Sequence, residues 1–293
     1  MTGIIVKGIA GFYYVKSEDV VYECKARGIF KKTGEVPCVG DFVRVEEVDE
    51  KKKTGIVSEI LPRENIFIRP PVANVEQLVI VCALADPEPN MAIIDKFLVM
   101  AERSRVDIVV CINKADLVED AKVQEIKSIY EGIYPVVLVN GNTGMGVDEL
   151  LRLLAGKRSA FAGPSGVGKS TIINLLQSGF DLETGEIGRK SKRGKHTTRH
   201  VEMFDLNVGG MVYDTPGFTS FDVLEAEEAE LTFLYPEFQK YLGLCKFDGC
   251  RHISEPGCAI KTAVSEGKIH KSRYNSYKSQ LEEIRERERQ KYQ

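Results

Sequence analysis

Residues 163 to 171, GPSGVGKST, carry the chemistry of phosphate binding. They fit the pattern G-x-x-x-x-G-K-S, in which glycines let successive backbone N–H groups converge on phosphate oxygens at the start of a helix. Lys169 would reach the β and γ oxygens, and Ser170 would bind Mg²⁺. A glycine-rich turn with a chance Lys-Ser pair is the alternative, which the apolar segments on both sides disfavour. The residues predicted to line the phosphates are Gly163, Pro164, Ser165, Gly166, Val167, Gly168, Lys169, Ser170 and Thr171.

The segment DTPG, residues 214 to 217, follows an apolar run and predicts a second contact to the same phosphates. Asp214 would hold Mg²⁺ through water, and the Gly217 N–H would meet the γ-phosphate. A D-x-x-G pattern is weak by itself, and the phosphate loop is what gives it weight here.

The segment NKAD predicts the reader of the base, with Asn113, Lys114 and Asp116 as its residues. A carboxylate at Asp116 can accept hydrogen bonds from the guanine N1–H and exocyclic amine, a donor pair that adenine lacks. Because an unpaired carboxylate is costly, the motif favours GTP and disfavours a P-loop ATPase or kinase. The alternative is an ordinary strand-to-helix turn in which Asp116 caps the helix.

Near the C-terminus, CKFDGCRHISEPGC has the ligand types of a metal site. Cys245, Cys250, His252 and Cys258 form C-x₄-C-x-H-x₅-C, which predicts one structural Zn²⁺ held tetrahedrally by three thiolates and an imidazole. Buried free cysteines beside an unrelated histidine are the alternative. The chain has seven cysteines, and this odd number fits a reducing compartment better than a disulfide framework.

These motifs need a scaffold, and the chain predicts a multidomain α/β protein. Short runs of Val, Ile, Tyr and Phe over residues 1–70 predict a small antiparallel β-barrel of the OB kind, or one that only packs against its neighbour. The linker RPPVANVEQ leads into a domain over residues 71–224, in which apolar strands alternate with amphipathic helices from residue 77 on; this pattern predicts a mainly parallel sheet. Within them, VEMFDLNV and GGMVYDTPG predict a hairpin turning at Asn207 to Gly210. Residues 225–293 predict a helical domain whose highly charged end is a solvated helix.

The base loop precedes the phosphate loop by some fifty residues, so the usual GTPase order is circularly permuted. A pocket at the carboxyl ends of strands depends on where loops lie in space, and joining old termini while opening new ones preserves it.

Composition limits the class of protein. With 43% hydrophobic and 28% charged residues, and no apolar run near the roughly 20 residues that cross a bilayer, we expect a soluble, cytoplasmic protein without a membrane partner. A net charge of −3 argues against coating nucleic acid by bulk charge, although a local basic patch can still bind phosphates.

The permuted motif order, with a barrel before it and a Cys/His cluster after it, resembles the bacterial ribosome small subunit-dependent GTPase A family over essentially the whole chain. The resemblance implies a GTPase that binds the small ribosomal subunit and its rRNA, assists late maturation and is stimulated by the subunit. It implies a permuted P-loop core, a C-terminal zinc-binding domain, Mg²⁺ with GTP, and the threonine pair Thr197 and Thr198. We expect a monomer. The alternative is a GTP-gated RNA-binding switch in which hydrolysis is incidental.

Two departures from the family limit what is carried over. The family has a Ser-Ala step at the guanine where this chain has NGNTG, residues 140 to 144, so the backbone contact to the base is predicted at Gly141 without the family's residue types. Related potassium-activated GTPases have Asn where this chain has Gly166, so no potassium requirement is predicted.

The segment GRKSKRGKHTTRH, residues 188 to 200, surrounds the threonine pair with basic side chains. With GTP, Thr198 could bind Mg²⁺ and bring Lys and Arg groups against rRNA phosphates; a solvated loop is the alternative. Many small GTPases orient the attacking water with a glutamine after D-x-x-G, where this chain has Phe218. We therefore predict His196 as the catalytic group on the subunit, with a mere contribution to the basic loop as the alternative.

Overall fold

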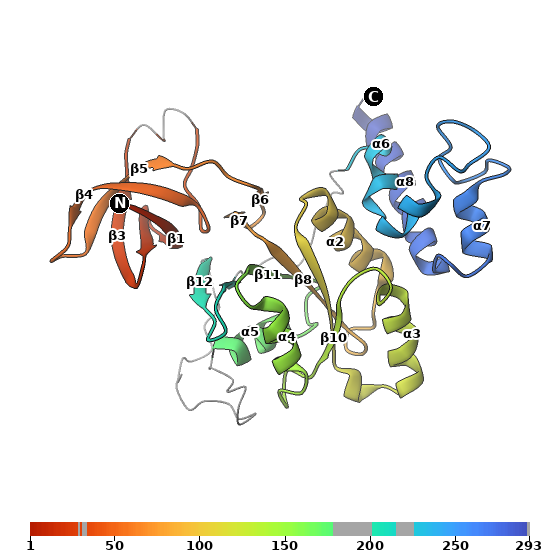
Figure 1. Ribbon diagram of the computed structural model, residues 1–293, viewed down its shortest axis with the longest axis horizontal. Coiled ribbons are helices and arrows are strands. Elements are labelled where there is room, and N and C mark those ends of the chain that lie inside the picture. The colour runs from red at the N-terminus through yellow and green to blue at the C-terminus, as the bar shows by residue number, and fades with distance from the viewer. Residues whose placement is uncertain (29, 31–33, 178–200, 215–225, 292–293) are drawn as a thin grey trace. The chain divides into compact units, whose positions relative to one another are not determined.

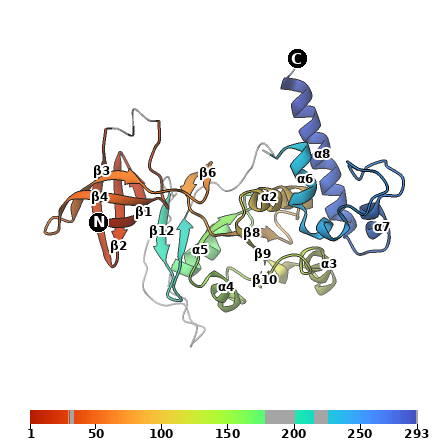
Figure 2. The ribbon, with the colours of Figure 1, turned by 45° about the horizontal axis from the view of Figure 1, so that its top comes forward.

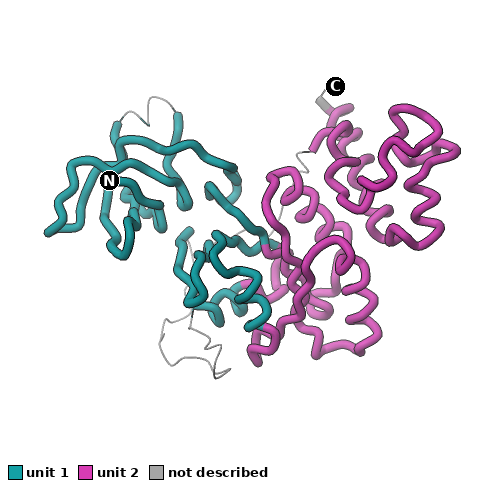
Figure 3. Tube along the Cα trace, viewed as in Figure 1, with its two compact units in different colours: residues 1–78, 147–162, 170–219 teal, residues 79–146, 163–169, 220–293 magenta. Residues whose placement is uncertain are grey.

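The computed structural model describes residues 1–28, 30, 34–177, 201–214 and 226–291, and elements are labelled as in Figure 1. The chain divides into two compact units, each built from three separate stretches (Figure 3). Unit 1 comprises residues 1–78, 147–162 and 170–219, and unit 2 comprises residues 79–146, 163–169 and 220–293.

A five-stranded barrel opens unit 1. Its strands lie in the order β1-β2-β3-β5-β4, and β1 also pairs with β4, which closes the barrel and confirms the predicted OB-like fold. One neighbouring pair, β3 with β5, is parallel. A closed ring with an odd number of strands cannot have every neighbour antiparallel, so the expected all-antiparallel barrel is wrong at this pair. The strands are β1 (Thr2–Ile9), β2 (Phe12–Ser17), β3 (Val20–Ala26), β4 (Phe42–Asp49) and β5 (Thr54–Ile60).

The proline-marked linker is itself structured. Strand β7 (Pro71–Ala73) pairs with β6 (Ile66–Ile68), and the Tyr213 hydroxyl donates to the Ala73 carbonyl at 2.7 Å. A Cβ on Gly40 of the barrel would lie 2.5 Å from the same hydroxyl, so glycine is needed there for this approach. Within unit 1, Gly40 of the barrel, Ala73 of the linker and Tyr213 therefore pack closely against one another.

The rest of unit 1 contains strands and helices that lie next to the predicted phosphate-binding segments in the sequence. Strands β12 and β13 form the predicted hairpin, with Leu206 N–H donating to the Gly210 carbonyl at 3.1 Å, and β13 lies parallel to β11. The buried side chains of β11 and of α4 and α5 explain why these segments are apolar. The elements are α4 (Val147–Leu154), β11 (Arg158–Ala162), α5 (Lys169–Gln177), β12 (Glu202–Asp205) and β13 (Met211–Asp214).

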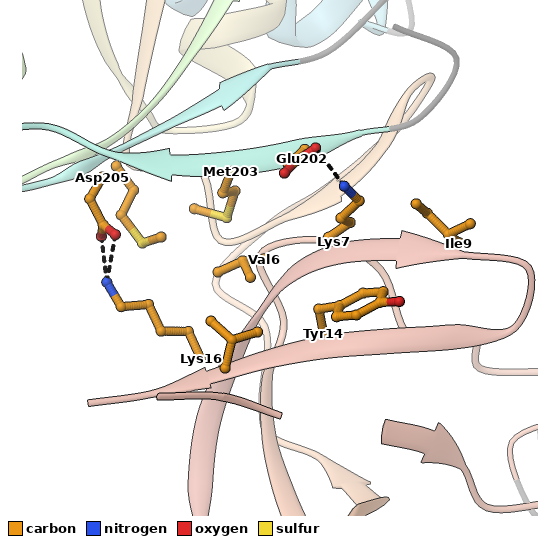
Figure 4. A pocket seen from close by; sticks show the side chains of 10 residues that line it. Val6, Lys7, Ile9, Tyr14, Lys16, Glu202, Met203 and Asp205 are labelled. Carbon is orange, nitrogen blue, oxygen red and sulfur yellow. Dashed lines mark hydrogen bonds and ion pairs between the residues drawn. The ribbon is translucent and has the colours of Figure 1, made fainter. Parts of the chain in front are cut away.

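A hollow of about 450 Å³ lies between the barrel and β12, where β1 and β12 pair at a single position, Lys7 with Glu202 (Figure 4). Two ion pairs cross it, Lys7 with Glu202 at 2.9 Å and Lys16 with Asp205 at 2.6 Å. Because both lysines are paired, the hollow presents no uncompensated cation, and we assign it no ligand. Its apolar lining includes Val6, Tyr14, Met203 and Met211.

In unit 2, strands β8, β9 and β10 lie side by side, and β10 runs parallel to β9. Every residue of β8 is buried, as expected for a strand covered on both faces. Asn90 caps α2 by accepting from the Ile93 N–H at 3.2 Å. The elements are β8 (Gln77–Ala83), α2 (Met91–Arg103), β9 (Asp107–Asn113), η1 (Ala115–Leu117), α3 (Asp120–Tyr130) and β10 (Val136–Val139).

The C-terminal helices share a core with α2 inside unit 2. Figure 2 shows α8 as one long helix with α6 beside it, and the two helices are in contact. The predicted solvated terminal helix is wrong for one face of α8, where Tyr277, Gln280, Leu281 and Ile284 are buried at helical spacing. The elements are α6 (Glu228–Leu231), η2 (Thr232–Leu234), η3 (Pro236–Tyr241), α7 (Ala259–Ser265) and α8 (Lys271–Lys291).

A fully buried arginine joins α8 to α2. The Arg273 guanidinium donates to Asp95 at 2.6 Å and to Glu237 at 2.7 Å, and it lies 4.6 Å from the ring centroid of Tyr235. Tyr130 donates its hydroxyl to the same Asp95 oxygen at 3.0 Å. Burying these charges is tolerable because each is paired and hydrogen-bonded.

No helix in the described ranges combines the length and the apolar character needed to cross a membrane.

Candidate nucleotide and metal sites

The phosphate loop follows β11 in the chain and leads into α5, as the motif requires. Gly163, Gly166 and Gly168 all have positive φ, at 141°, 81° and 98°. A Cβ on Gly163 would lie 2.2 Å from the Val81 carbonyl oxygen, and one on Gly168 would lie 2.2 Å from Asn113 Nδ2. Only glycine fits these two positions, because both the backbone conformation and the space exclude a side chain.

Lys169 folds back over its own loop. Its ammonium donates to the carbonyl oxygens of Gly163 and Pro164, each at 2.7 Å. Burial lowers the pKa of Lys169 to about 8, because the described surroundings offer dipoles but no countercharge. The lysine is thus held at the loop, where a polyphosphate would supply the missing negative charge.

Asn113 is the hub of the base loop. It ends β9 and is buried, its Nδ2 donates to the Val167 carbonyl at 2.9 Å, and its Oδ1 accepts from the Gly141 N–H at 3.2 Å. One amide therefore ties the base loop both to the phosphate loop and to the segment after β10. Sequence reasoning placed Asn113 at the base and missed this bracing role, for which no local pattern gives a signal.

Lys114 adds a second tie within unit 2. Its backbone is left-handed with φ 61°, and its ammonium donates to the carbonyls of Asp86 and Gly166. Asp116 lies in η1 with an exposed carboxylate. The alternative in which Asp116 caps a helix is wrong, since the N-cap positions of η1 and α3 are Lys114 and Glu119.

The segment at residues 140 to 144 forms a tight turn beside Asn113. The Asn140 Oδ1 accepts from the backbone N–H groups of Asn142 and Thr143 at 2.9 and 3.1 Å. Gly141 is buried, and its N–H donates to Asn113. Because this N–H already donates to Asn113, the guanine contact predicted at Gly141 would either compete with Asn113 for the N–H or use another group.

The candidate magnesium residues of unit 1 lie at element ends. Ser170 is exposed in the first turn of α5, next to Thr171 of the predicted phosphate loop, and Asp214 is the last residue of β13. Burial, followed by the charge of Glu202, raises the pKa of Asp214, so a cation beside it would favour the ionised form. The predicted roles of His196, Thr197, Thr198, Gly217 and Phe218 fall on positions outside the described residues.

The predicted metal ligands converge in unit 2. The candidate ligand atoms of Cys245, Cys250, His252 and Cys258 all lie within 4.8 Å of one another. His252 Nδ1 is 3.6 Å from the Cys245 sulfur and 3.4 Å from the Cys258 sulfur, and those two sulfurs are 3.9 Å apart. Metal–sulfur bonds of 2.3 Å in a tetrahedron put sulfurs about 3.8 Å apart, so the cluster can hold a metal ion of this type. All four positions are filled by protein, which is the pattern of a structural centre.

The described motif residues thus belong to a P-loop GTPase whose motif order is circularly permuted, with an OB-like barrel before it and a Cys/His cluster that can hold a metal ion after it. Models of the RsgA GTPase and the RsgA N-terminal domain match residues 60–224 and 2–57. The small ribosomal subunit biogenesis GTPase RsgA of Alkaliphilus metalliredigens is 45% identical over 288 residues, covering 98% of this chain and 99% of that protein.

Two solved structures are similar over nearly the full length. YjeQ from Thermotoga maritima superposes with a TM-score of 0.82 at 36% identity, covering 97% of this chain and 98% of the other. YloQ, described as a circularly permuted GTPase, gives 0.80 at 36% identity, covering 98% and 95%. The chain belongs to the RsgA GTPase family.

GTP affinity of the free protein is expected to fall as pH rises above about 8, because the Lys169 pKa is lowered to about 8 by burial. Bound phosphates favour the charged form of Lys169. Below that pKa the lysine of the free protein already carries its proton, whereas above it the protein must take up a proton when GTP binds. The expected loss approaches tenfold per pH unit up to the pKa of the complex. Titration calorimetry in buffers of different ionisation enthalpy would detect the proton. Lys169→Arg, which stays charged, is the control; a flat wild-type profile contradicts the assignment.

Proposed function

We propose that this chain binds the small ribosomal subunit, assists its late maturation and hydrolyses GTP to GDP and phosphate under stimulation by that subunit. The observation that carries the proposal is the near end-to-end match to a GTPase named for small ribosomal subunit biogenesis, at 45% identity. The braced phosphate and base loops of unit 2 support it, because they supply the scaffold for a guanine nucleotide.

For the nucleotide, Asn113, Lys114 and Asp116 would read guanine, with a further backbone contact at Gly141. Residues 163 to 171 would surround the phosphates, with Lys169 on the β and γ oxygens. Gly217 would donate its N–H to the γ-phosphate. Mg²⁺ accompanying GTP would neutralise charge that develops on the phosphates. Ser170 and Thr198 would bind the ion directly, and Asp214 would hold it through water.

The attacking water needs a partner other than Phe218, whose side chain cannot hydrogen-bond. His196 stands directly before the threonine pair in sequence, so we assign it to that water on the subunit. A group supplied on docking can raise phosphoryl-transfer rates by about 10³- to 10⁵-fold in other GTPases. The basic residues of the same segment would meet rRNA phosphates.

For the metal, we propose one structural Zn²⁺ on Cys245, Cys250, His252 and Cys258. The sulfur and nitrogen donors and the distances between Cys245, Cys258 and His252 favour zinc over ions that prefer oxygen ligands, such as Mg²⁺.

We also propose three domains: a barrel over residues 1–70, the GTPase domain over 71–224 and the zinc domain over 225–293. We further propose a cytoplasmic monomer with no membrane partner.

Purified small subunits, but not large subunits, should co-sediment with the GTP-bound protein and raise its GTPase rate at least tenfold. The same assay with His196→Ala is expected to keep subunit binding and lose most of the stimulated rate, while His200→Ala, in the same segment, serves as the control. Equal responses to both subunits would contradict the proposed partner. Full stimulation of His196→Ala would leave the partner intact and remove the catalytic role.

Co-sedimentation that depends on GTP without any gain in hydrolysis would instead identify a GTP-gated RNA-binding switch. Single-turnover rates with and without the subunit separate this outcome, since a switch shows the same slow chemical step in both conditions.

A further inference from the structure

A glutamate between two metal ligands organises the loop of the metal site. Glu255 lies three residues after His252 and three before Cys258. Its Oε1 accepts from the Arg251 N–H and its Oε2 accepts from the Ile253 N–H, both at 2.8 Å. The carboxylate therefore bridges the backbone N–H groups of the residues immediately before and after the imidazole ligand.

The backbone of His252 explains why such a brace is needed. Its φ is 60°, in the left-handed region, which is strained for a residue that has a Cβ. In that conformation the flanking N–H groups turn toward one side and form a concave anion-binding nest. Although burial raises the pKa of Glu255, its backbone hydrogen bonds lower that pKa to about 2, so the nest holds an anion.

Helix α8 holds the backbone carbonyls of Arg251 and His252. The Tyr274 hydroxyl donates to the His252 carbonyl at 2.7 Å, and the Tyr277 hydroxyl donates to the Arg251 carbonyl at 3.0 Å. Glu255 and the two tyrosines thus hold backbone groups of Arg251, His252 and Ile253 by four hydrogen bonds. With these in place His252 is buried and its Nδ1 faces the sulfurs of Cys245 and Cys258.

We propose that Glu255 is a positioning residue for the metal centre: its carboxylate holds His252 in the left-handed conformation that aims Nδ1 at the thiolates. The inference rests on the metal site proposed above. Glu255 is not itself a ligand in this arrangement, because each of its oxygens is engaged by a backbone N–H and it lies outside the four converging residues. Partners that orient metal ligands typically contribute about 10- to 100-fold in metal affinity.

The test compares the full-length protein with Glu255→Gln, Glu255→Ala and the matched control Glu286→Gln, which changes an exposed glutamate of α8. Zn²⁺ affinity is measured by competition with a chromophoric chelator. Glu255→Gln keeps the size of the side chain and one acceptor, so about a tenfold loss is expected. Glu255→Ala removes both acceptors, so the expected loss approaches about 100-fold. The control should match the wild type.

Cobalt substitution separates positioning from general stability. At saturating Co²⁺, the visible d–d bands of Glu255→Ala should shift, because His252 is no longer held at ligand distance. A variant that is merely less stable keeps the wild-type bands once saturated. Circular dichroism compares folding, and if Glu255→Ala does not fold, Glu255→Gln decides alone.

The outcomes distinguish the two proposals. If the wild-type protein binds neither Zn²⁺ nor Co²⁺, the proposed metal site itself is wrong. A wild type that binds one equivalent, with Glu255 variants of equal affinity and unchanged bands, overturns the role of Glu255 and leaves the metal site standing.

Discussion

Asp116→Asn should exchange the preference of the protein from GTP to xanthosine triphosphate. Guanine offers N1–H and an exocyclic amine to a carboxylate, whereas xanthine replaces the amine with a carbonyl that only a donor such as the asparagine amide can satisfy. Two hydrogen bonds to a charged group are worth roughly 3–6 kcal/mol together, which is about 10²- to 10⁴-fold in affinity. Competition between labelled GTP and both unlabelled nucleotides measures the change.

In the structure, this substitution leaves the contacts that hold the base loop unchanged. Asp116 is exposed in η1, whereas the contacts that brace the loop belong to Asn113 and Lys114, so the variant should fold normally. Asp120→Asn, at an exposed carboxylate in the first turn of α3, provides the matched control. An Asp116→Asn protein that still prefers GTP over xanthosine triphosphate would show that the base is read elsewhere.

Arg273→Met should destabilise unit 2 by about 3–5 kcal/mol, the cost of leaving a buried carboxylate without its cation. Asp95 and Arg273 are both fully buried, and Glu237 is almost so. Methionine fills much of the space but leaves both carboxylates unpaired. Urea unfolding followed by a probe in unit 2 measures the loss, and hydrogen exchange of the α8 amides should show it locally.

Two comparisons test the cause of that loss. Arg289→Met, which breaks an exposed pair with Glu282, should cost less than about 1 kcal/mol. Adding Asp95→Asn to Arg273→Met should recover part of the stability, because it removes one of the two uncompensated charges. An Arg273→Met protein as stable as Arg289→Met would show that the buried pair contributes little.

Much of the site could be predicted because its signals are local in the chain. The phosphate loop needs glycines at positions with positive φ followed by a lysine, and the four metal ligands fall within residues 245–258. The hairpin at residues 202–214 carries its own turn residues. In each case neighbouring residues supply both the pattern and the contacts, so residue type and spacing are sufficient.

The contacts that connect distant segments could not be predicted from local patterns. Arg273 reaches Asp95 across 178 positions, and this pairing draws α8 into a core although its composition predicts a solvated helix. Asn113 joins Val167 and Gly141, and the Tyr213 hydroxyl reaches the Ala73 carbonyl. Residue types and their spacing were enough to indicate which side chains could do the chemistry, since that follows from side-chain type and local backbone freedom. Which residues brace them depends on long-range packing, where one buried charge or amide is stable only if the fold brings its partner to it.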